Sequence, residues 1–301
     1  MNIKTPILYC GYNRLNVTKK SINILKKIKT KKIYICLDGP KENHDDEMKI
    51  NKIKKFLKST KFSSKVIFKF RKKNLGCKHS IANALSWFFH NEKFGIILED
   101  DILPSYDFFK FCEYGLNKYK KSNKISMICG TNYLGSKKIS NEYFYSKHFL
   151  IWGWATWKHV WKKYDVNMKD WKLKKVRSRI KKEFSNEEYQ FLSNRFDQLT
   201  LNYKDTWDIQ WYFMCIKNKY LSVMPVSNLI TNIGVVGTHS KKFYKTLFLK
   251  SGKIDIQNLI YPKKIIQNKK FDLKLHREFN FKKNFIQKIY YKIKNYIHEF
   301  L

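Results

Sequence analysis

The sequence predicts an α/β protein with a mostly parallel sheet covered by helices, and three observations support this. Short runs rich in β-branched and aromatic residues recur through residues 1–130, with helically periodic segments between them. The runs are apolar almost throughout, as expected of parallel strands that are buried on both faces. A polar cluster follows each of the first four runs, where ligands of such sheets bind.

The strand and helix patterns alternate along the chain. Asn16 can cap a helix after the first strand, and residues 80–92 and 105–119 predict helices after the third and fourth strands. This alternation is typical of parallel sheets, because each parallel connection has to cross back over the sheet. The expected strands are residues 6–11, 32–37, 65–70, 94–98 and 125–129.

Three parts of the chain differ in pattern. Residues 1–130 form the first half of one domain, and residues 131–240, rich in tryptophan and less periodic, form its second half. Residues 241–301 form a basic helical tail, and in its last segment, 284–301, apolar residues share one helical face with lysines opposite. This helix either docks on the domain or lies on an anionic membrane surface, and the sequence leaves both open.

The chain carries 62 basic and 24 acidic residues, and the formal net charge is +38. Because the lysines are dispersed, the charge indicates either a solvated basic surface or an anionic partner, and nucleic acid is disfavoured. The six cysteines lie far apart, which favours reduced thiols in a cytoplasmic protein. No apolar run reaches the roughly 20 residues of a membrane span, so any contact with the inner face of the cell membrane is expected to be peripheral.

The polar clusters after the first four strands are expected to meet at one edge of the sheet. A single cluster is ordinary turn chemistry, since Asp-Gly-Pro makes a turn by itself, but four clusters on one edge predict a ligand site. The clusters are residues 12–14, 38–40, 71–76 and 99–101.

Three carboxylates, Glu99, Asp100 and Asp101, directly follow the fourth strand. Mg²⁺ and Mn²⁺ prefer oxygen ligands, and Mg²⁺ usually takes one or two carboxylates together with substrate phosphates. Adjacent residues of an extended chain point in opposite directions, so the three cannot all bind one cation. We expect one to bind the metal and the others to accept hydrogen bonds from ligand hydroxyls. The alternative is an exposed acidic turn that caps the following helix.

The segment GIILEDDILPSYDFF, residues 95–109, resembles the metal-site segment of GT-A glycosyltransferases, in particular the group around N-acetylglucosaminyltransferase I. That resemblance implies a Rossmann-like GT-A fold, Mn²⁺ or Mg²⁺ on Asp101, and donor contacts from Glu99 and Asp100. TPILYCGYNR and ICLDGP resemble the first two strands of the family, which implies that Arg14 and Asp38 lie at the uracil of the donor.

The segment TWDIQWYF resembles the Trp-Asp segment that carries the catalytic base of the family, and the matching residue is Asp208. A separate base implies a single displacement with inversion. Ile209 stands where the family has a second Asp, which leaves the acceptor open. The alternative is that Asp205 or Asp208 simply caps a helix.

Two further segments contribute candidate residues. GVVGTHS, which ends at Ser240, contains glycines that allow close backbone approach and hydroxyls on Thr238 and Ser240 for the donor. His239 is either a further metal ligand or an ordinary loop histidine. IWGWATWKHVW resembles an acceptor-side Gly-Trp segment. Trp152 and Trp154 of this segment, together with Trp207 of TWDIQWYF, are expected to stack on the acceptor sugar, with an aromatic core as the alternative.

These features predict a metal-dependent glycosyltransferase that moves a sugar, with inversion, from a UDP-sugar to a glycan or lipid-linked glycan. We expect a role in assembling bacterial surface polysaccharide or lipooligosaccharide. A sugar-nucleotide nucleotidyltransferase is the alternative, although GYNRLN after the first strand holds one glycine where such enzymes need a glycine-rich loop.

Overall fold

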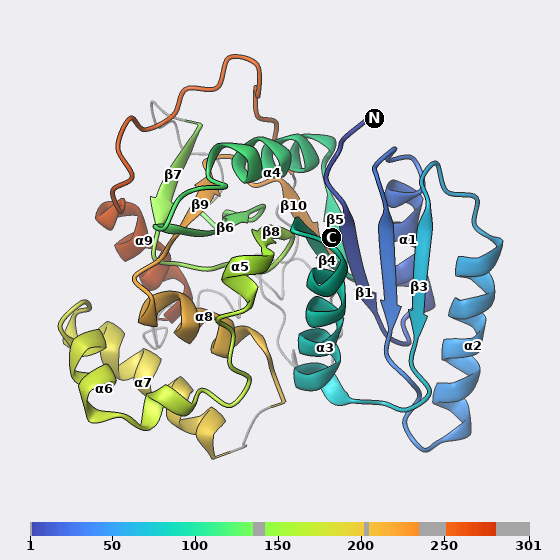
Figure 1. Ribbon diagram of the computed structural model, residues 1–301, viewed down its shortest axis with the longest axis horizontal. Coiled ribbons are helices and arrows are strands. Elements are labelled where there is room, and N and C mark those ends of the chain that lie inside the picture. Colours follow the sequence, from blue (N-terminus) through green and yellow to red (C-terminus); the bar gives the residue numbers. More distant parts are fainter. Residues whose placement is uncertain (1, 135–141, 202–204, 235–250, 281–301) are drawn as a thin grey trace, which may run out of the picture.

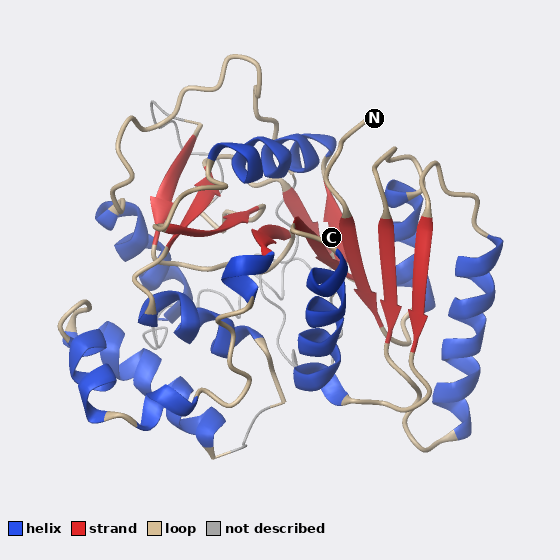
Figure 2. Cartoon of the chain, in the orientation of Figure 1, coloured by secondary structure: helices blue, strands red, loops and turns tan. Residues whose placement is uncertain are grey.

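The computed structural model describes residues 2–134, 142–201, 205–234 and 251–280 (Figure 1). An eight-stranded sheet has helices on both faces, and a two-stranded sheet lies beside it (Figure 2). The predicted α/β class is therefore confirmed. Each of the five predicted strands is present, with bounds within one residue of those expected.

The strand order of the large sheet is β3-β2-β1-β4-β8-β6-β9-β7. Four of its seven neighbouring pairs are parallel, including all three among β1 to β4, so the sheet is mostly parallel as predicted. β8 runs antiparallel to both of its neighbours, and β7 runs antiparallel to β9. The strands are β1 (Ile7–Gly11), β2 (Ile33–Leu37), β3 (Val66–Phe70), β4 (Phe94–Glu99), β6 (Ile125–Cys129), β7 (Tyr143–Ser146), β8 (Trp154–Trp157) and β9 (Leu221–Pro225).

A small antiparallel sheet extends the edge where β4 ends. It pairs β5 (Ile102–Pro104) with β10 (Ile230–Asn232), so that Asn232 lies opposite Ile102. The chain after β10 is thereby brought back to the end of β4, although the two segments are far apart in the sequence.

Local sequence signals explain where several helices begin. Asn43 caps α2, since its side chain accepts a hydrogen bond from the Asp46 backbone N–H at 2.8 Å, and Ser105 caps α4. Arg14, not the predicted Asn16, is the N-cap residue of α1. The helices are α1 (Leu15–Leu25), α2 (His44–Ser59), α3 (Gly76–Asn91), α4 (Tyr106–Lys118), α5 (Lys158–Trp161), the 3₁₀ helix η1 (Lys169–Lys172), α6 (Lys174–Lys181), α7 (Asn186–Thr200), α8 (Asp208–Lys217) and α9 (Lys269–Asn280).

Part of the predicted tail packs on the second half of the sheet. Phe271 and Leu275 of α9 are buried, and the Phe271 ring lies 3.8 Å from that of Phe144 on β7. The buried Asp272 carboxylate accepts hydrogen bonds from the Ser146 hydroxyl and, at 2.9 Å, from the Lys147 backbone N–H. The predicted amphipathic helix at 284–301 lies outside the described residues, and the division of the chain at 130/131 and 240/241 stays a prediction. Among the described residues, no helix is long and apolar enough to cross a membrane.

Candidate functional site

The parallel strands bring several predicted site residues to one edge of the sheet. β1 pairs with β4 so that Cys10 lies opposite Glu99, and with β2 so that Gly11 lies opposite Leu37. Because the three strands run in the same direction and end at the same level, the residues that follow them share this edge. In Figure 1 the strands β1 to β3 point toward the end of α3 that begins the helix.

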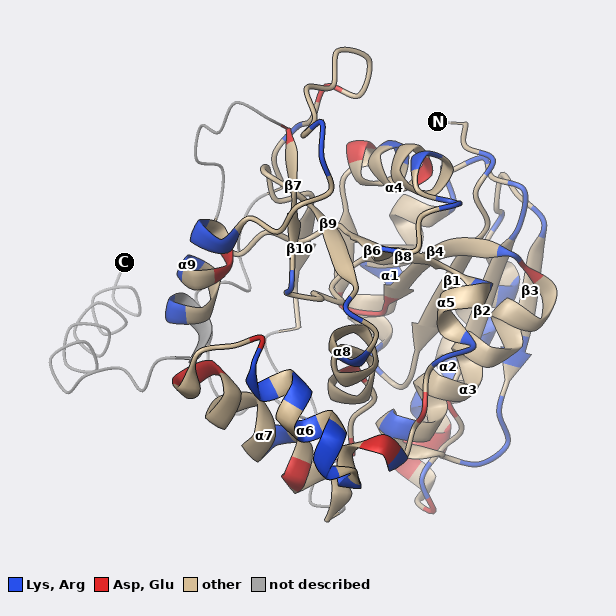
Figure 3. Ribbon diagram, turned by 60° about the vertical axis from the view of Figure 1, so that its left-hand side comes forward, with Lys and Arg blue, Asp and Glu red and all other residues tan. Residues whose placement is uncertain are grey.

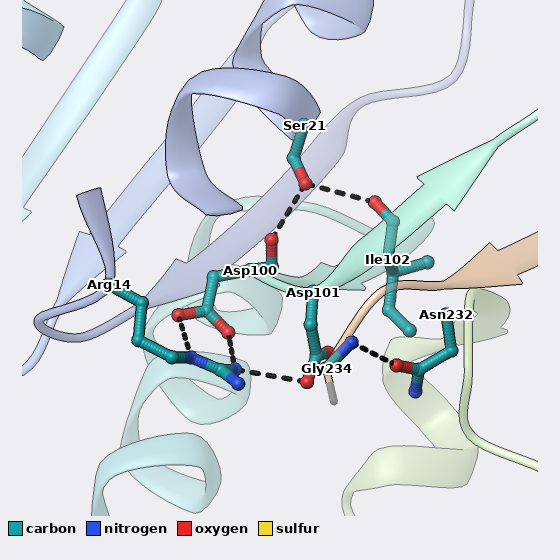
Figure 4. A network of polar contacts seen from close by, with 7 residues as sticks. All are labelled: Arg14, Ser21, Asp100, Asp101, Ile102, Asn232 and Gly234. Carbon is teal, nitrogen blue, oxygen red and sulfur yellow. Dashed lines mark hydrogen bonds and ion pairs between the residues drawn. The ribbon is translucent and has the colours of Figure 1, made fainter. Parts of the chain in front are cut away.

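Arg14 forms ion pairs with both Asp100 and Asp101 (Figure 4). Its Nε donates to Asp100 Oδ2 at 3.2 Å, and its Nη2 donates to Asp100 Oδ1 and, at 3.0 Å, to Asp101 Oδ2. Burial lowers the pKa of Arg14, but the charges of Asp100 and Asp101 outweigh it and raise that pKa, so the guanidinium stays charged. The Asp100 side chain is 8% exposed and the Asp101 side chain 21%, so Asp101 is the more accessible carboxylate.

The turn that carries these carboxylates is fixed from two sides. The Ser21 hydroxyl of α1 lies 2.7 Å from the carbonyl oxygen of Asp100 and 3.1 Å from that of Ile102, and its single proton can serve either acceptor. From the other side, the Ile233 backbone N–H donates to the Asp101 carbonyl oxygen at 2.9 Å. The Asp101 side chain is therefore held by the fold before any ligand binds.

Gly234 begins the predicted phosphate-neighbour segment and lies directly against Asp101 (Figure 4). A Cβ atom at this position would lie 2.2 Å from Asp101 Oδ2, so the close approach requires glycine. The Gly234 backbone N–H donates to Asn232 Oδ1 at 2.7 Å, which fixes the chain after β10. Thr238, His239 and Ser240 lie outside the described residues.

Asp38 follows β2 and is tied to the segment before α3. Both of its carboxylate oxygens lie 3.2 Å from the backbone nitrogen of Leu75, and the Arg71 guanidinium lies 3.8 Å away. Burial raises the pKa of Asp38, and the Leu75 hydrogen bond offsets part of that effect. Asp38 therefore shares the edge of the sheet with Arg14, although no hydrogen bond or ion pair among the described residues joins the two.

Asp46 is a residue of this edge that the sequence did not reveal. It accepts hydrogen bonds from the Tyr12 hydroxyl, from Asn13 Nδ2 at 2.6 Å and from the Lys41 backbone N–H at 2.7 Å. Burial acts to raise its pKa, but these hydrogen bonds outweigh it and lower the pKa of Asp46. The carboxylate thereby connects the loop after β1 to the loop after β2. One feature of the sequence could have indicated this role: Asp45 and Asp46 follow Asn43 in the first turn of a helix, where a carboxylate can point back toward the preceding loops.

Glu99 and Asp208 lie close enough to interact electrostatically. Burial is the main cause that raises the pKa of Glu99, and the negative charges of Asp101, Asp100 and Asp208 raise it further. The Glu99 Oε1 atom is buried and has no hydrogen-bond partner among the described residues. Asp208 is the first residue of α8, where the Thr206 hydroxyl donates to its carboxylate. The second half of the chain therefore contributes an acid beside the carboxylates of the first half.

Asp205, the alternative to Asp208 as a helix cap, has a different partner. Its carboxylate accepts hydrogen bonds from the backbone N–H groups of Cys77 at 2.7 Å and Lys78 at 2.8 Å, which are the first free donors of α3. Asp205 therefore caps α3 from a distant part of the chain. This contact also draws the start of α8 toward α3.

The three predicted acceptor-stacking tryptophans occupy different environments. Trp154 is 0% exposed and Trp207 is 1% exposed, and their rings stack with centroids 5.7 Å apart. Both belong to the aromatic core, so neither ring has a free face for a sugar, and we do not propose them as stacking residues. Trp152 is half-buried, with its ring 4.9 Å from that of Tyr133, so it keeps an accessible part.

Within the described ranges, no group of three or more His, Cys, Asp or Glu side chains could hold a metal ion by itself. A cation at this edge would therefore need oxygen ligands from its substrate as well as from Asp101. That requirement matches the habit of Mg²⁺, which is commonly bound by one or two carboxylates plus phosphate oxygens.

No protein-family model matches the chain, and no curated protein matches it. Among solved structures, the inositol-1-phosphate CTP transferase from T. maritima is 12% identical over 76% of this chain and 89% of that chain, with a TM-score of 0.41. The mannosyltransferase PcManGT from Pyrobaculum calidifontis, in complex with GDP-Man and Mn²⁺, is 9% identical over 71% and 70%, with a TM-score of 0.35. HddC from Yersinia pseudotuberculosis is 16% identical over 53% and 80%, with a TM-score of 0.32. Likeness at this level does not assign an activity to this chain.

Proposed function

We propose that this chain is a glycosyltransferase that uses a nucleotide-sugar donor, with a UDP-sugar as the first donor to test. The observation that supports this most strongly is the set of charged residues at the carboxyl edge of the parallel strands. Arg14, Asp38, Asp100 and Asp101 share this edge, and the charge of Asp208 reaches Glu99 from the other half of the chain. Ligands of open α/β sheets bind at this edge.

Asp101 is the proposed ligand for Mn²⁺ or Mg²⁺. It is the more exposed of the carboxylates that pair with Arg14, and the absence of a side chain at Gly234 lets the backbone after β10 approach it closely. When bound, the cation supplies Lewis-acid stabilisation of the diphosphate leaving group. Arg14 already lies against Asp101 Oδ2, so the chain also has a permanent positive charge at this position. His239 is proposed as a further ligand on the sequence alone.

The remaining residues have separate proposed roles. Arg14 and Asp38 hold the base end of the nucleotide. Hydrogen bonds to the nucleotide sugar come from the carboxyl groups of Glu99 and Asp100 and from the hydroxyls of Thr238 and Ser240. Asp208 accepts the proton of the acceptor hydroxyl as its oxygen bonds to the anomeric carbon. The bond from that carbon to the diphosphate breaks, and the nucleoside diphosphate leaves with the electron pair. Attack opposite the leaving group inverts the anomeric centre.

A product assay separates this proposal from nucleotidyl transfer. With UDP-sugars, Mn²⁺ and glycan acceptors, glycosyl transfer releases UDP, whereas a nucleotidyltransferase exchanges labelled pyrophosphate into the nucleotide sugar. We expect release of UDP without pyrophosphate exchange. Pyrophosphate exchange without UDP release would instead assign nucleotidyl transfer.

Calorimetry of UDP with and without Mn²⁺ tests the metal assignment. Asp101→Asn is expected to weaken Mn²⁺-dependent UDP binding by more than roughly tenfold, because a neutral amide is a poorer cation ligand. Asp45→Asn is the control, since Asp45 is an exposed carboxylate of α2 paired with Lys49. Unchanged Mn²⁺-dependent affinity in Asp101→Asn would show that Asp101 does not bind the cation.

A lipid-linked acceptor at the inner face of a bacterial membrane is the finer form of the proposal. The outward face of α9 supports it, because Lys269, Lys270 and Arg277 are exposed there and Leu273 is 44% exposed (Figure 3). Basic residues near an anionic bilayer contribute about 1 kcal/mol each at best. Co-sedimentation with vesicles that contain phosphatidylglycerol should occur at low salt and should be absent with neutral vesicles.

A further inference from the structure

A cavity of about 160 Å³ lies between the start of α3 and the segment before α6, and the proposed donor site does not use it. Its lining includes Lys78 and Lys172 as charged residues and Asn167 and Thr200 as hydrogen-bonding residues, with Met168 and Leu199 as apolar ones. We propose that this cavity is an acceptor subsite that binds a sugar carrying an anionic group, either a carboxylate or a phosphate. The role of the cavity as an acceptor subsite rests on the proposed glycosyltransferase function, whereas binding of an anionic sugar there can be tested without it.

Two connections hold the cavity beside Asp208. On one wall, the Lys78 backbone N–H donates to Asp205 at 2.8 Å, and Asp205 lies three residues before Asp208. On the other side, just before the turn that lines the cavity, the Tyr164 hydroxyl donates at 3.1 Å to the carbonyl oxygen of Trp207, the residue before Asp208. Tyr164 leads directly into the turn that lines the cavity. These contacts connect the surroundings of the cavity to the residues just before Asp208, the proposed general base.

The charged residues that line the cavity are both basic. None of its seven lining residues is acidic, and neither Lys78 nor Lys172 forms an ion pair within the described ranges. Asp205 and Asp165 lie beside the cavity walls, where each accepts two hydrogen bonds from backbone N–H groups rather than forming an ion pair with either lysine. Two lysines and no acid in the lining favour an anion over a neutral ligand, and charge-assisted hydrogen bonds are the stronger kind.

The turn that forms one wall is held in an unusual conformation. Met168 has φ 50° and ψ 42°, in the left-handed region that non-glycine residues seldom adopt, and its side chain is buried. Asp165 stabilises the turn by accepting hydrogen bonds from the backbone N–H groups of Asn167 and Lys169, each at 2.9 Å. Such a conformation costs about 1–3 kcal/mol and persists only where surrounding structure over-determines it. The wall is therefore preformed.

The test measures binding of simple sugars to the full chain by ligand-observed NMR titration. The probes are methyl β-D-glucuronide and D-glucose 6-phosphate as anionic sugars, and methyl β-D-glucoside as the neutral one. We expect the better anionic probe to bind at least roughly tenfold more tightly than the glucoside, as one charge-assisted hydrogen bond allows. The comparison of the two anionic probes identifies carboxylate or phosphate as the preferred group.

Substitutions locate the binding. Lys78→Gln and Lys172→Gln should each reduce the preference for the anionic probe by roughly tenfold. Lys175→Gln is the control, because this exposed lysine of neighbouring α6 removes the same charge without lining the cavity. Equal binding of anionic and neutral sugars, or an equal loss in all three variants, would overturn the proposal.

The two proposals can fail separately. Selective binding of an anionic sugar in the absence of any UDP-sugar turnover would keep the subsite and reject the glycosyltransferase. Turnover with neutral acceptors alone, at a rate unaffected by Lys78→Gln and Lys172→Gln, would keep the enzyme and reject the subsite.

Discussion

At the β3-β2-β1-β4 end of the large sheet every neighbouring pair is parallel, whereas at the β8-β6-β9-β7 end two of the three pairs are antiparallel. At the parallel end, the residues that follow the strands lie at a single edge, where they form ion pairs and hydrogen bonds that connect neighbouring loops. The mixed end distributes its strand ends over both edges, and large aromatic side chains fill its interior.

The two ends of the sheet therefore have different roles, one in placing site residues and the other in packing. The shared direction of the parallel strands is enough to bring Arg14, Asp38 and Asp101, which are far apart in the sequence, to one edge of the sheet. The mixed end makes one contribution to the edge, the start of α8 with Asp208. The strand directions thus predict that substitutions at the parallel end alter ligand binding or the anchoring of the loops, and that those at the mixed end, except at Asp208, remove core packing.

Asp208→Asn tests that exception and has the largest expected effect. Turnover should fall by roughly 10² to 10⁴-fold, the usual contribution of a general base, while UDP affinity stays within about twofold. Kinetics of UDP release with calorimetry of UDP would measure both. Near-normal turnover in a protein with an unchanged melting temperature would reduce Asp208 to a helix-start residue and leave the mixed end without a catalytic role.

Trp154→Ala, paired with Trp152→Ala, tests whether the mixed end is a packing region. Trp154→Ala should lower the free energy of unfolding by about 3–5 kcal/mol, because the substitution leaves a large cavity beside Trp207 and Trp211. Trp152→Ala removes a half-buried ring, so it should lower stability less and should weaken acceptor binding instead. Denaturant unfolding and acceptor kinetics would separate the two, and equal losses of stability would contradict the assignment.

Asp46→Asn tests the parallel end with the smallest expected effect. The lowered pKa of Asp46 means that its stabilisation is present above its ordinary pKa of about 4 and is lost as the pH falls through its folded pKa. The variant should therefore be about 2 kcal/mol less stable at pH 7, and the difference should shrink below about pH 4.

The neighbouring Asp45→Asn is the matched control for this measurement. Asp45 is exposed and its ion pair with Lys49 lies on the surface, so its removal should change stability by less than about 0.5 kcal/mol at either pH. A pH-independent loss in Asp46→Asn would mean that the shape of the side chain matters rather than its charge.

The sequence predicted the parallel end well because its signals are local. Each strand there is a short apolar run that ends in polar residues, and strand direction follows from the helices between the runs. The residues of the edge, Arg14, Asp38 and Asp101, could therefore be collected from their order alone. Their pairing could not, because nothing in the sequence says that Arg14 would bind the two carboxylates.

The mixed end was harder because its elements are defined by distant partners. β8 is four residues of an aromatic segment, and it becomes a strand because β4 and β6 pair with it on both sides. From the sequence alone, Trp154 and Trp207 fit either stacking on a sugar or an aromatic core, and their burial assigns them to the core. Asp205 was considered as a cap for its own helix, but it caps α3, and sequence periodicity does not report such long-range contacts.

The position of β8 between β4 and β6 also bears on how the chain acquires its fold. Residues 94–97 of β4 find this partner only when residues 154–157 have been synthesised, and β6 has to wait further for β9 at 221–225. Such separations raise the contact order, so folding is slow compared with local helix formation. Until then one edge of β4 carries unpaired N–H and C=O groups that can pair with another chain. We expect the amides of β4 that face β8 to gain protection from hydrogen exchange only together with those of β8, whereas amides that face β1, such as that of Ile96, can be protected earlier.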